Sequence, residues 1–578
     1  GRLVGDDVAE ASAEAVKAGT DLTCGGEYRA LVDAVKLGLI KEGEIDTALE
    51  RLMVARFKLG MFDPPERVPF SKIPYSEDDS EAHRQVSLEA ARKSIVLLKN
   101  DKNTLPIPAS VKTIAVVGPA ADDPEALLGN YNGFSIRQVS PLEGMEKQFA
   151  GKVKFALGAT YTNRTHAPIA SAALTPPDGA GHGVLAEYFD NATFQGTPKA
   201  KRVEARPAIG DLPDPALVSA GIPHNGFSVR WTGTLTPPVS GDYVLGVRTG
   251  GGGRGAPRVP MHVFLDDKEV VGDNASPGLA RVREAHTQLE AGHTYKLRVE
   301  YAPAVAASGV QMMWVPPAEP LLNQALESIK GADVAVVFVG LNSNLEGEEM
   351  PVAIPGFAGG DRTSLDLPET QQKLIDAAIG TGKPVVVVVS TGSAVSINSA
   401  AAKAAAVMEA WYAGEEAGTA IAETLAGANN PSGRMPVTFY KSVDQLPPFD
   451  DYAMKNRTYR YFKGEALYEF GYGLSYSTFQ YSGLRTKRDA SGARVSVRVK
   501  NASKRDGDEV VELYFDGQGG PDDPIRQLRG FQRVHLKAGE SKQVVLTVPS
   551  SDVPKNRVKI NVGGGQPTGS IPHVGGTL

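Results

Sequence analysis

The sequence is short of several residue types, and each shortage excludes a class of protein. A single cysteine, Cys24, rules out internal disulfides and any cysteine-based metal cluster. No apolar run approaches the roughly 18 residues that a membrane helix needs, so we do not expect contact with a membrane. None of the nine histidines has a plausible triad partner or metal-ligand spacing, and we expect neither metal nor cofactor.

The charge and length are ordinary for a large globular protein. The net charge of -6 comes without a basic stripe, which argues against nucleic acid and favours a neutral substrate. A chain of 578 residues is too long for one core, and about three to five domains are expected. The chain opens at Gly1 without methionine or a targeting peptide, so we expect that Gly1 is not the native N-terminus.

Residues 1–60 have a helical pattern that is too short to close a domain. Apolar residues recur at three and four spacing over 8–18, 27–37 and 45–59, and Thr20–Cys24 is predicted as a short strand. Strand and helix alternate here as at the end of a parallel α/β unit. Prolines between 64 and 74 then predict a linker.

Two kinds of pattern follow. An α/β alternation begins near residue 79, with strands at 95–98 and 113–117, and resumes at 321 after an interruption, with strands at 334–339, 384–390 and 407–411. The interruption, from about 183 to 317, alternates apolar and polar residues with period two, which predicts an inserted antiparallel β unit. From about 451 the pattern is again β, with a strand near 494–499 among others, and predicts a seven-stranded sandwich with a loose tail after 561.

The stretch from Asp333 to Arg362 holds the strongest chemical signal. Val334–Val339 is an unbroken β-branched and aromatic run, typical of a parallel strand buried on both faces. The loop beyond it crowds together Glu346, Glu348 and Glu349, and such loops hold ligands in open α/β sheets. Mutual repulsion predicts that at least one carboxyl keeps its proton near neutrality, as a general acid must. A solvated acidic loop is the alternative.

Three further residues are candidates near this loop. Asp361 and Arg362 end it, and a Gly-Gly-Asp-Arg turn is able to orient the glutamate or to fasten the loop to a barrel domain by a bidentate pair; a structural salt bridge is the alternative. Cys24 has no activating partner in the sequence and is predicted to be a small buried hydrophobe near the pocket wall. Trp231, Trp314 and Tyr243 lie in alternating strands, where aromatics are core more often than sugar platforms.

Several motifs together resemble glycoside hydrolase family 3, the β-glucosidase and β-xylosidase family. They are AVKAGTDLTCG at the start, ARKSIVLLKNDKNTLPI at 91–107, LEGEEM with GGDRTSLDLP at 345–368, PSGRMPVTFY at 431–440, and NRTYRYFKGEALYEFGYGLSYSTF at 456–479. The inserted β unit, with GVLAEYF and RWTGTLTPPVSGDYVLGV, resembles a PA14 domain.

The resemblance implies a multidomain α/β plus β fold in six segments. These are 1–62, a C-terminal remnant of a (β/α)8 barrel; 63–84, a linker; 85–180, the first part of an α/β sandwich; 181–318, a PA14-like β insert; 319–450, the second part of the sandwich; and 451–578, a linker and a fibronectin type III-like β-sandwich. The family's nucleophile motif, a Ser-Asp pair, lies upstream of AVKAGTDL and is not in this chain. Asp6 and Asp7 do not match it and are predicted to cap the first helix.

The implied activity is that of a retaining exo-β-glycosidase releasing terminal β-D-glucose or β-D-xylose from oligosaccharides or β-glycosides. Retention needs two carboxyl groups. We expect this chain to supply the acid/base, with Glu346 the first candidate and Glu348 the second, while Asp361, Arg362 and Cys24 line the substrate side. DLTCG leans slightly toward the xylosidase-like branch.

The resemblance also bears on partners and location. A separate barrel chain or a homo-oligomer is a possible protein partner, and the family favours a secreted or periplasmic location. The rival hypothesis is a non-catalytic carbohydrate-binding or assembly fragment, which the missing nucleophile favours.

Overall fold

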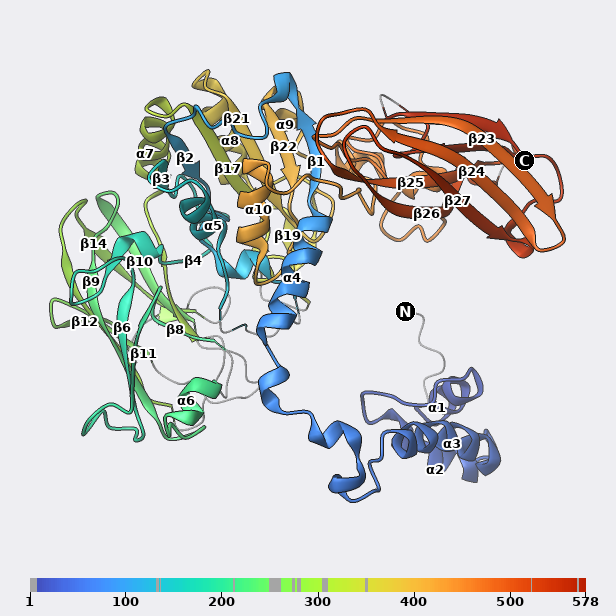
Figure 1. Cartoon of the computed structure of the whole chain (residues 1–578). Coiled ribbons are helices and arrows are strands. Elements are labelled where there is room, and N and C mark those ends of the chain that lie inside the picture. Colours follow the sequence, from blue (N-terminus) through green and yellow to red (C-terminus); the bar gives the residue numbers. More distant parts are fainter. Residues whose placement is uncertain are drawn as a thin grey trace. The chain divides into compact units, whose positions relative to one another are not determined.

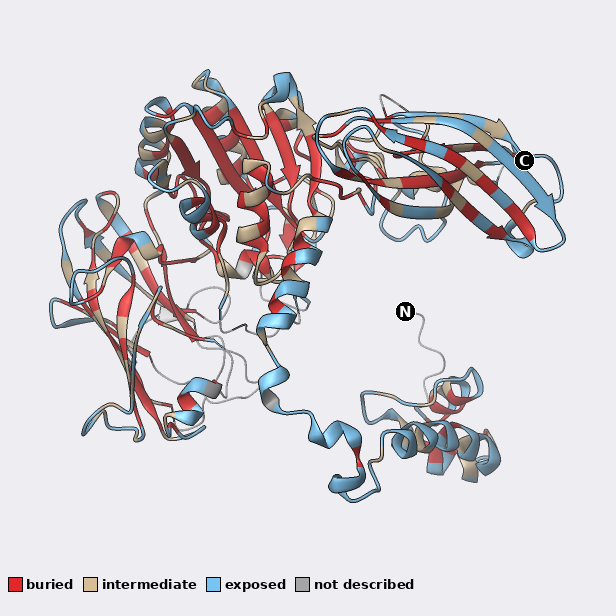
Figure 2. Cartoon of the chain, viewed as in Figure 1, coloured by how far each residue is buried: buried red, intermediate tan, exposed pale blue. Residues whose placement is uncertain are grey.

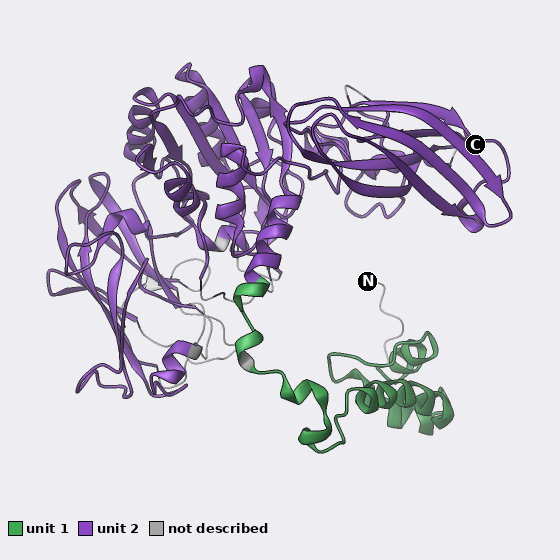
Figure 3. Cartoon of the chain, viewed as in Figure 1, with its two compact units in different colours: residues 1–83 green, residues 84–578 purple. Residues whose placement is uncertain are grey.

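The computed structural model describes residues 8–578 except 131–134, 136, 211–213, 249–260, 273–275, 278–281, 304–309, 349–351, 521 and 569–570. The chain forms two compact units, residues 1–83 and 84–578, drawn in different colours in Figure 3. Each is described by itself. In the part of the chain that the structure describes, no helix has both the length and the apolar character to cross a bilayer.

The first unit is a small helical assembly. Helices α1 (Val8–Lys17), α2 (Leu31–Lys36) and α3 (Glu42–Lys58) match the predicted helical segments, although 27–30 is a 3-10 turn. The predicted strand at 20–24 is wrong. Within the described residues of this unit no strand is present to pair with it, and an isolated strand has no ladder to satisfy its backbone.

A six-stranded sheet forms the centre of the second unit, as Figure 1 shows. Its order is β1-β22-β21-β17-β2-β3. These strands are β1 (Val96–Asn100), β2 (Ile114–Val117), β3 (Val153–Ala156), β17 (Val334–Gly340), β21 (Val385–Ser390) and β22 (Ala406–Glu409). All neighbours are parallel except β1, which runs antiparallel to β22 at the edge.

Helices cover both faces of this sheet, which is why its central strands are uniformly apolar. The connections leave β2 and β17 in opposite directions, so right-handed crossovers put their helices on opposite faces. On one face α7 (Ala318–Lys330), α8 (Glu369–Gly380) and α9 (Asn398–Lys403) pack in series. On the other, α5 (Pro141–Gln148) packs on α10 (Ala417–Ala426). Every residue of β17 and β21 is buried, as Figure 2 shows.

The inserted β unit builds two sheets between β3 and α7. Their orders are β13-β14-β10-β16-β4, with β8 beside β16, and β12-β11-β15-β9-β6-β7, with β5 beside β9. The principal strands are β6 (Val184–Phe189), β9 (Ser228–Leu235), β10 (Gly241–Arg248), β11 (Met261–Leu265), β14 (Val282–Leu289), β15 (Tyr295–Tyr301) and β16 (Val310–Val315). The shorter strands are β4 (Ala167–Pro168), β5 (Leu174–Thr175), β7 (Ala200–Glu204), β8 (Ala208–Ile209), β12 (Lys268–Val271) and β13 (Ser276–Pro277). Trp231, Trp314 and Tyr243 are fully buried between them, which confirms a core role.

The chain ends in a β-sandwich of a three-stranded sheet, β23-β24-β27, and a four-stranded sheet, β26-β25-β28-β29. The strands are β23 (Phe479–Asp489), β24 (Gly492–Asn501), β25 (Gly507–Asp516), β26 (Arg526–Leu536), β27 (Ser541–Pro549), β28 (Lys559–Gly563) and β29 (His573–Thr577). The predicted loose tail is wrong, because β28 pairs with β25 and β29 with β28.

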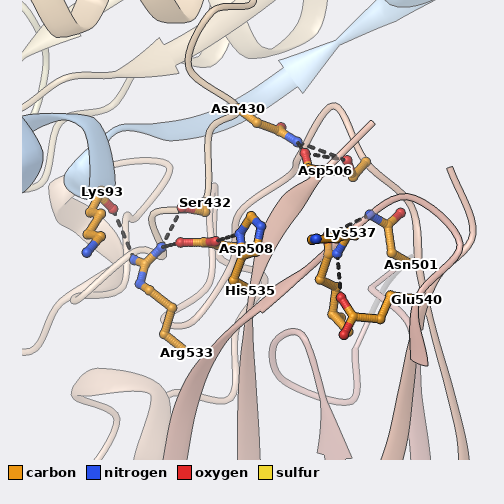
Figure 4. Close-up of polar contacts among 12 residues, drawn as sticks. Lys93, Asn430, Ser432, Asn501, Asp506, Asp508, Arg533, His535, Lys537 and Glu540 are labelled. Carbon is orange, nitrogen blue, oxygen red and sulfur yellow. Dashed lines mark hydrogen bonds and ion pairs between the residues drawn. The ribbon is translucent and has the colours of Figure 1, made fainter. Parts of the chain in front are cut away.

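Side-chain contacts fasten this sandwich to the α/β sheet domain, and Figure 4 shows one group of them. Arg533 of β26 donates to the Ser432 hydroxyl and, at 3.1 Å, to the carbonyl of Lys93. Its guanidinium also lies 3.6 Å from Asp508 of β25. Deeper in the interface, Arg434 donates to the buried carboxylate of Glu509 at 2.7 Å. The two domains of the second unit are therefore joined by bonded polar groups.

Candidate active site

The loop that leaves β17 is anchored at its start and carries the predicted carboxylates. Leu341 and Leu345 are buried, and the backbone N–H groups of Leu345 and Glu346 donate to the carbonyl of Asn342. Farther on, the loop forms the small sheet β18 (Ala353–Ile354), β19 (Phe357–Ala358) and β20 (Asp361–Arg362). Glu349 lies outside the described residues.

Glu346 is held by side chains from two other strand ends. Its Oε1 accepts a hydrogen bond from the Tyr412 hydroxyl at 2.5 Å, and its Oε2 accepts one from the Ser393 hydroxyl at 2.8 Å. The Arg362 guanidinium approaches Oε2 to 4.0 Å, and both side chains of this pair are 13% exposed. Both oxygens of the Glu346 carboxylate are thus already engaged.

The partners of Glu346 come together because β17, β21 and β22 are adjacent and parallel. Ser393 follows β21, Tyr412 follows β22, and parallel strands deliver their carboxyl ends to the same edge. Gly392, which precedes Ser393, lies against Tyr412: a Cβ on Gly392 would lie 2.8 Å from Cε2 of Tyr412 and would displace that ring. Sequence reasoning missed Ser393 and Tyr412. The signal that could have found them is their place immediately after two predicted strands.

Arg362 ties the end of the loop to the segment after β21. It donates to the Ser393 hydroxyl at 3.2 Å and to the carbonyl of Ser364 at 3.0 Å, and its guanidinium lies over the ring of Phe357. Burial lowers the pKa of Arg362, and the nearby Glu346 opposes that shift. Asp361, its neighbour, is exposed. The contact with Glu346 is a single approach of 4.0 Å, while a bidentate pair between this turn and the barrel stays a prediction.

Glu348 differs from Glu346 in its surroundings. Its side chain is exposed, and it makes no hydrogen bond or ion pair with any residue that the structure describes. The Tyr412 hydroxyl donates its hydrogen bond to Glu346. Burial, and then the nearby carboxylate of Glu346, raise the pKa of Tyr412, so this phenol keeps its proton and remains a donor. The idea that crowded carboxylates keep one proton stays a prediction.

A second polar group lies where the strand order reverses, between β2 and β17. Asp123 is fully buried there and accepts from the Asn342 amide at 3.3 Å. Burial raises the pKa of Asp123 to about 6, opposed by Tyr161, Asn342 and two arginines. One of these, Arg206 of the insert, donates to the carbonyl and the carboxylate of Asp122 at 3.0 and 3.1 Å. The insert therefore closes this switch point with its own side chains.

The remaining predicted residue, Cys24, belongs to the first unit, which is described by itself. Cys24 is exposed, so its predicted burial is wrong within that unit, while its place on the substrate side stays a prediction. It is not among the residues of that unit's described hydrophobic core, and polar residues and glycines neighbour it in TDLTCGG. Across the described ranges, no cluster of three or more His, Cys, Asp or Glu has a metal-binding arrangement.

Comparison with known proteins identifies the family of this chain. The family model of the glycosyl hydrolase family 3 C-terminal domain matches residues 95–476, and that of a fibronectin type III-like domain matches residues 509–554. A xylan 1,4-beta-xylosidase of Xylanibacter ruminicola is 35% identical over 544 residues, covering 93% of this chain and 61% of that protein. A periplasmic beta-glucosidase of Salmonella typhimurium is 26% identical over 568 residues, covering 93% and 55%.

A solved structure shares the fold. The β-glucosidase from Kluyveromyces marxianus in complex with glucose superposes with a TM-score of 0.70 at 24% identity, covering 98% of this chain and 71% of that one. This chain spans less than two thirds of the length of the two curated relatives, at 61% and 55%. Because the C-terminal domain model matches well over half of the residues, this chain belongs to glycosyl hydrolase family 3.

Proposed function

We propose that this chain supplies the acid/base half of a retaining exo-β-glycosidase site that releases terminal β-D-glucose or β-D-xylose. The names of its relatives, a xylan 1,4-beta-xylosidase and a beta-glucosidase, support the substrate class. The loop beyond β17 supports the role, since it presents a carboxyl group at the carboxyl edge of a parallel sheet. The family's nucleophile is an aspartate, and we assign that role to no residue of these 578.

Within the loop, the contacts of Glu346 carry the assignment of roles. A general acid must bring its proton within hydrogen-bond reach of the leaving oxygen. Both oxygens of Glu346 already accept hydrogen bonds from Tyr412 and Ser393, so that carboxylate is not free to turn toward a substrate. Glu348, two residues on and exposed, is free to do so. We therefore assign the acid/base role to Glu348 and a positioning role to Glu346, which reverses their predicted order.

In the proposed reaction, Glu348 first donates one proton and then takes one back. Its carboxyl proton goes to the glycosidic oxygen as the bond to the anomeric carbon breaks and the nucleophile's carboxylate bonds to that carbon. The resulting carboxylate of Glu348 then takes a proton from water, whose oxygen displaces the enzyme ester and leaves the sugar with its original configuration. Glu346 and Arg362 keep the loop in place throughout.

The other parts take roles that follow from the family. Residues 1–62 would complete a (β/α)8 barrel that holds the nucleophile, supplied by a longer or a separate chain or by a homo-oligomer. The PA14-like insert, whose Arg206 reaches the edge of the α/β sheet, would border the aglycone side. A secreted or periplasmic location fits the relative named as periplasmic.

The rival function is a non-catalytic carbohydrate-binding or assembly fragment, and one assay separates the two. Release of 4-nitrophenol from its β-glucoside and β-xyloside is measured with this chain alone and with an added family 3 barrel domain. We expect turnover in the mixture. Binding of xylo- or cello-oligosaccharides by calorimetry, with no turnover in either sample, would favour the rival.

Two variants test the assignment of roles. Glu348→Gln should lower kcat/KM by about 10²–10⁴-fold on 4-nitrophenyl glycosides, with much less loss of kcat/KM on 2,4-dinitrophenyl glycosides, whose leaving group needs no proton. Azide should restore its turnover as a glycosyl azide. Glu346→Gln is the matched control and should slow all leaving groups alike without azide rescue. Azide rescue of Glu346→Gln in place of Glu348→Gln would restore the original order.

A further inference from the structure

Glu409 is a buried carboxyl group that the reaction steps above do not use. It is the last residue of β22, and its exposure is 0%. The sheet neighbours β1 and β21 flank it on either side. A carboxyl group is seldom enclosed so completely without a structural or chemical reason.

The contacts of Glu409 hold the chain just beyond the strand. Its Oε1 accepts a hydrogen bond from the Trp411 backbone N–H at 3.0 Å. Trp411 has a φ of 58°, a left-handed conformation that is costly for a bulky aromatic residue. The indole N–H of Trp411 also donates to the carbonyl of Ser94 at 3.0 Å, and its ring meets Phe439 edge-on. The turn is thus held at both its backbone and its side chain.

We propose that Glu409 is a positioning residue whose buried carboxyl group fixes the Trp411 turn and thereby holds the Tyr412 hydroxyl on Glu346. Tyr412 directly follows the strained residue, so the direction of its ring depends on that turn. Its hydroxyl lies 2.5 Å from Oε1 of Glu346. A relaxed Trp411 would swing the phenol away and leave Glu346 with Ser393 as its one close donor.

Burial favours the neutral acid form of Glu409, because it raises the pKa of this carboxyl well above the ordinary value, while hydrogen bonding from Trp411, Thr391 and Ala410 opposes the rise. Among the described residues, Oε2 of Glu409 has no hydrogen-bond partner. Tyr412 and Tyr468 are the titratable groups that feel its charge, and neither supplies a cation. A glutamine, which keeps the accepting oxygen, should therefore replace it.

The inference rests on the proposed function only for its effect on catalytic turnover, so the test measures the local stability and geometry of the chain around Trp411. Hydrogen exchange of the peptide containing Trp411 is followed by mass spectrometry in the wild type, Glu409→Gln and Glu409→Ala. Crystal structures of the variants give the distance from Tyr412 to Glu346. We expect Glu409→Gln to keep the wild-type protection and the wild-type distance from Tyr412 to Glu346. Glu409→Ala should lose about tenfold in protection, the equivalent of one hydrogen bond, and should also lose the contact between Tyr412 and Glu346.

The pH dependence adds a readout that a purely structural role would not move. As the pH rises through the pKa of Glu409 in the folded protein, protection of the Trp411 amide should fall in the wild type and stay constant in Glu409→Gln. Equal loss in Glu409→Gln and Glu409→Ala, or the same pH response in Glu409→Gln and the wild type, would overturn the proposal. Glu409→Gln is sufficient to test the proposal, so the proposal can still be overturned if Glu409→Ala does not fold. Absence of turnover in every sample would remove the proposed function and leave this result intact.

Discussion

Two carboxyl groups follow adjacent strands of one sheet and are treated in opposite ways. Asp123 follows β2 and is enclosed at the switch point, with arginines of the insert nearby. Glu346 follows β17 and is held by two hydroxyls and a more distant guanidinium, with an exposed glutamate two residues away. Asp123 lies beside the junction that its neighbour Asp122 makes with Arg206 of the insert, whereas Glu346 lies in the loop that carries the proposed acid/base. A carboxylate at the ligand-binding edge of an α/β sheet is therefore not by itself a catalytic signal.

The largest expected effect comes from breaking the junction at the switch point. Arg206→Leu would leave Asp122, whose side chain is 7% exposed, without its cation, and should destabilise the second unit by about 3 kcal/mol. The midpoint of denaturant unfolding measures this. Lys296→Ala is the control, since the pair of Lys296 with Asp267 is 65% and 64% exposed and should contribute little. An unchanged midpoint in Arg206→Leu would show that the insert is held without this pair.

On the catalytic side, the largest effect should come from displacing Tyr412. Gly392→Ala would place a Cβ 2.8 Å from the Tyr412 ring, pushing the phenol off Glu346 and lowering kcat by about 10²-fold with little change in fold stability. In Gly129→Ala the new Cβ would meet the same ring at an ordinary 3.8 Å, which makes it the matched control. The measurement is steady-state kinetics on 4-nitrophenyl glycosides with the added barrel domain. Equal rates for the two variants would contradict the role of Tyr412 in positioning Glu346.

Removing the phenol's oxygen alone should have a smaller effect. Tyr412→Phe loses the donor to Glu346 and should lower kcat by about tenfold, with about 1 kcal/mol lost in stability. Tyr476→Phe removes a comparable bond, from its hydroxyl to the carbonyl of Thr424 at 2.8 Å, and should cost similar stability without affecting kcat. Kinetics and thermal melts of the pair separate positioning from packing. Loss of rate in both variants would indicate a general effect on the fold.

A pH dependence of stability is expected on the structural side, with no effect on the positioning of Glu346. The pKa of Asp123 is raised from 3.8 to about 6 in the folded state, so folding retains a proton that the unfolded chain releases. Its stabilising contribution is complete below about pH 3.8 and is lost as the pH rises through about 6, with a slope of at most about 1.4 kcal/mol per pH unit. Asp123→Asn should flatten that part of the stability profile between pH 4 and 7. Superimposable profiles would mean that Asp123 does not titrate there.

Local periodicity explains how much of the fold the sequence revealed. The continuous apolar run at 334–339 predicted a strand buried on both faces, and β17 has that burial pattern. The alternating pattern at 494–499 predicted a strand buried on one face, and β24 has that pattern. Prediction failed where pairing decided the outcome. Thr20–Cys24 has strand-like residues but no strand to pair with, whereas the glycine-rich tail gains β29 because β28 offers an edge.

The sequence predicted which loop carries the candidate site, but not the role of each glutamate in that loop. Three glutamates beyond a buried strand indicated where chemistry could lie. Choosing between Glu346 and Glu348 required their surroundings, because residues two apart share every local signal. The predicted strand at 407–411 likewise hid the turn at Trp411, whose positive φ is set by contacts with Glu409 and Ser94.

The sequence by itself determined the order of α/β and β segments, the buried strand and the acidic loop after it, because these depend on side-chain periods that neighbouring residues carry. Only the tertiary structure decided which glutamate is held and which is free. The groups that hold Glu346, Tyr412 and Ser393, are 66 and 47 positions away along the chain. They reach it because parallel strands bring their ends to one edge, a juxtaposition that no local pattern encodes.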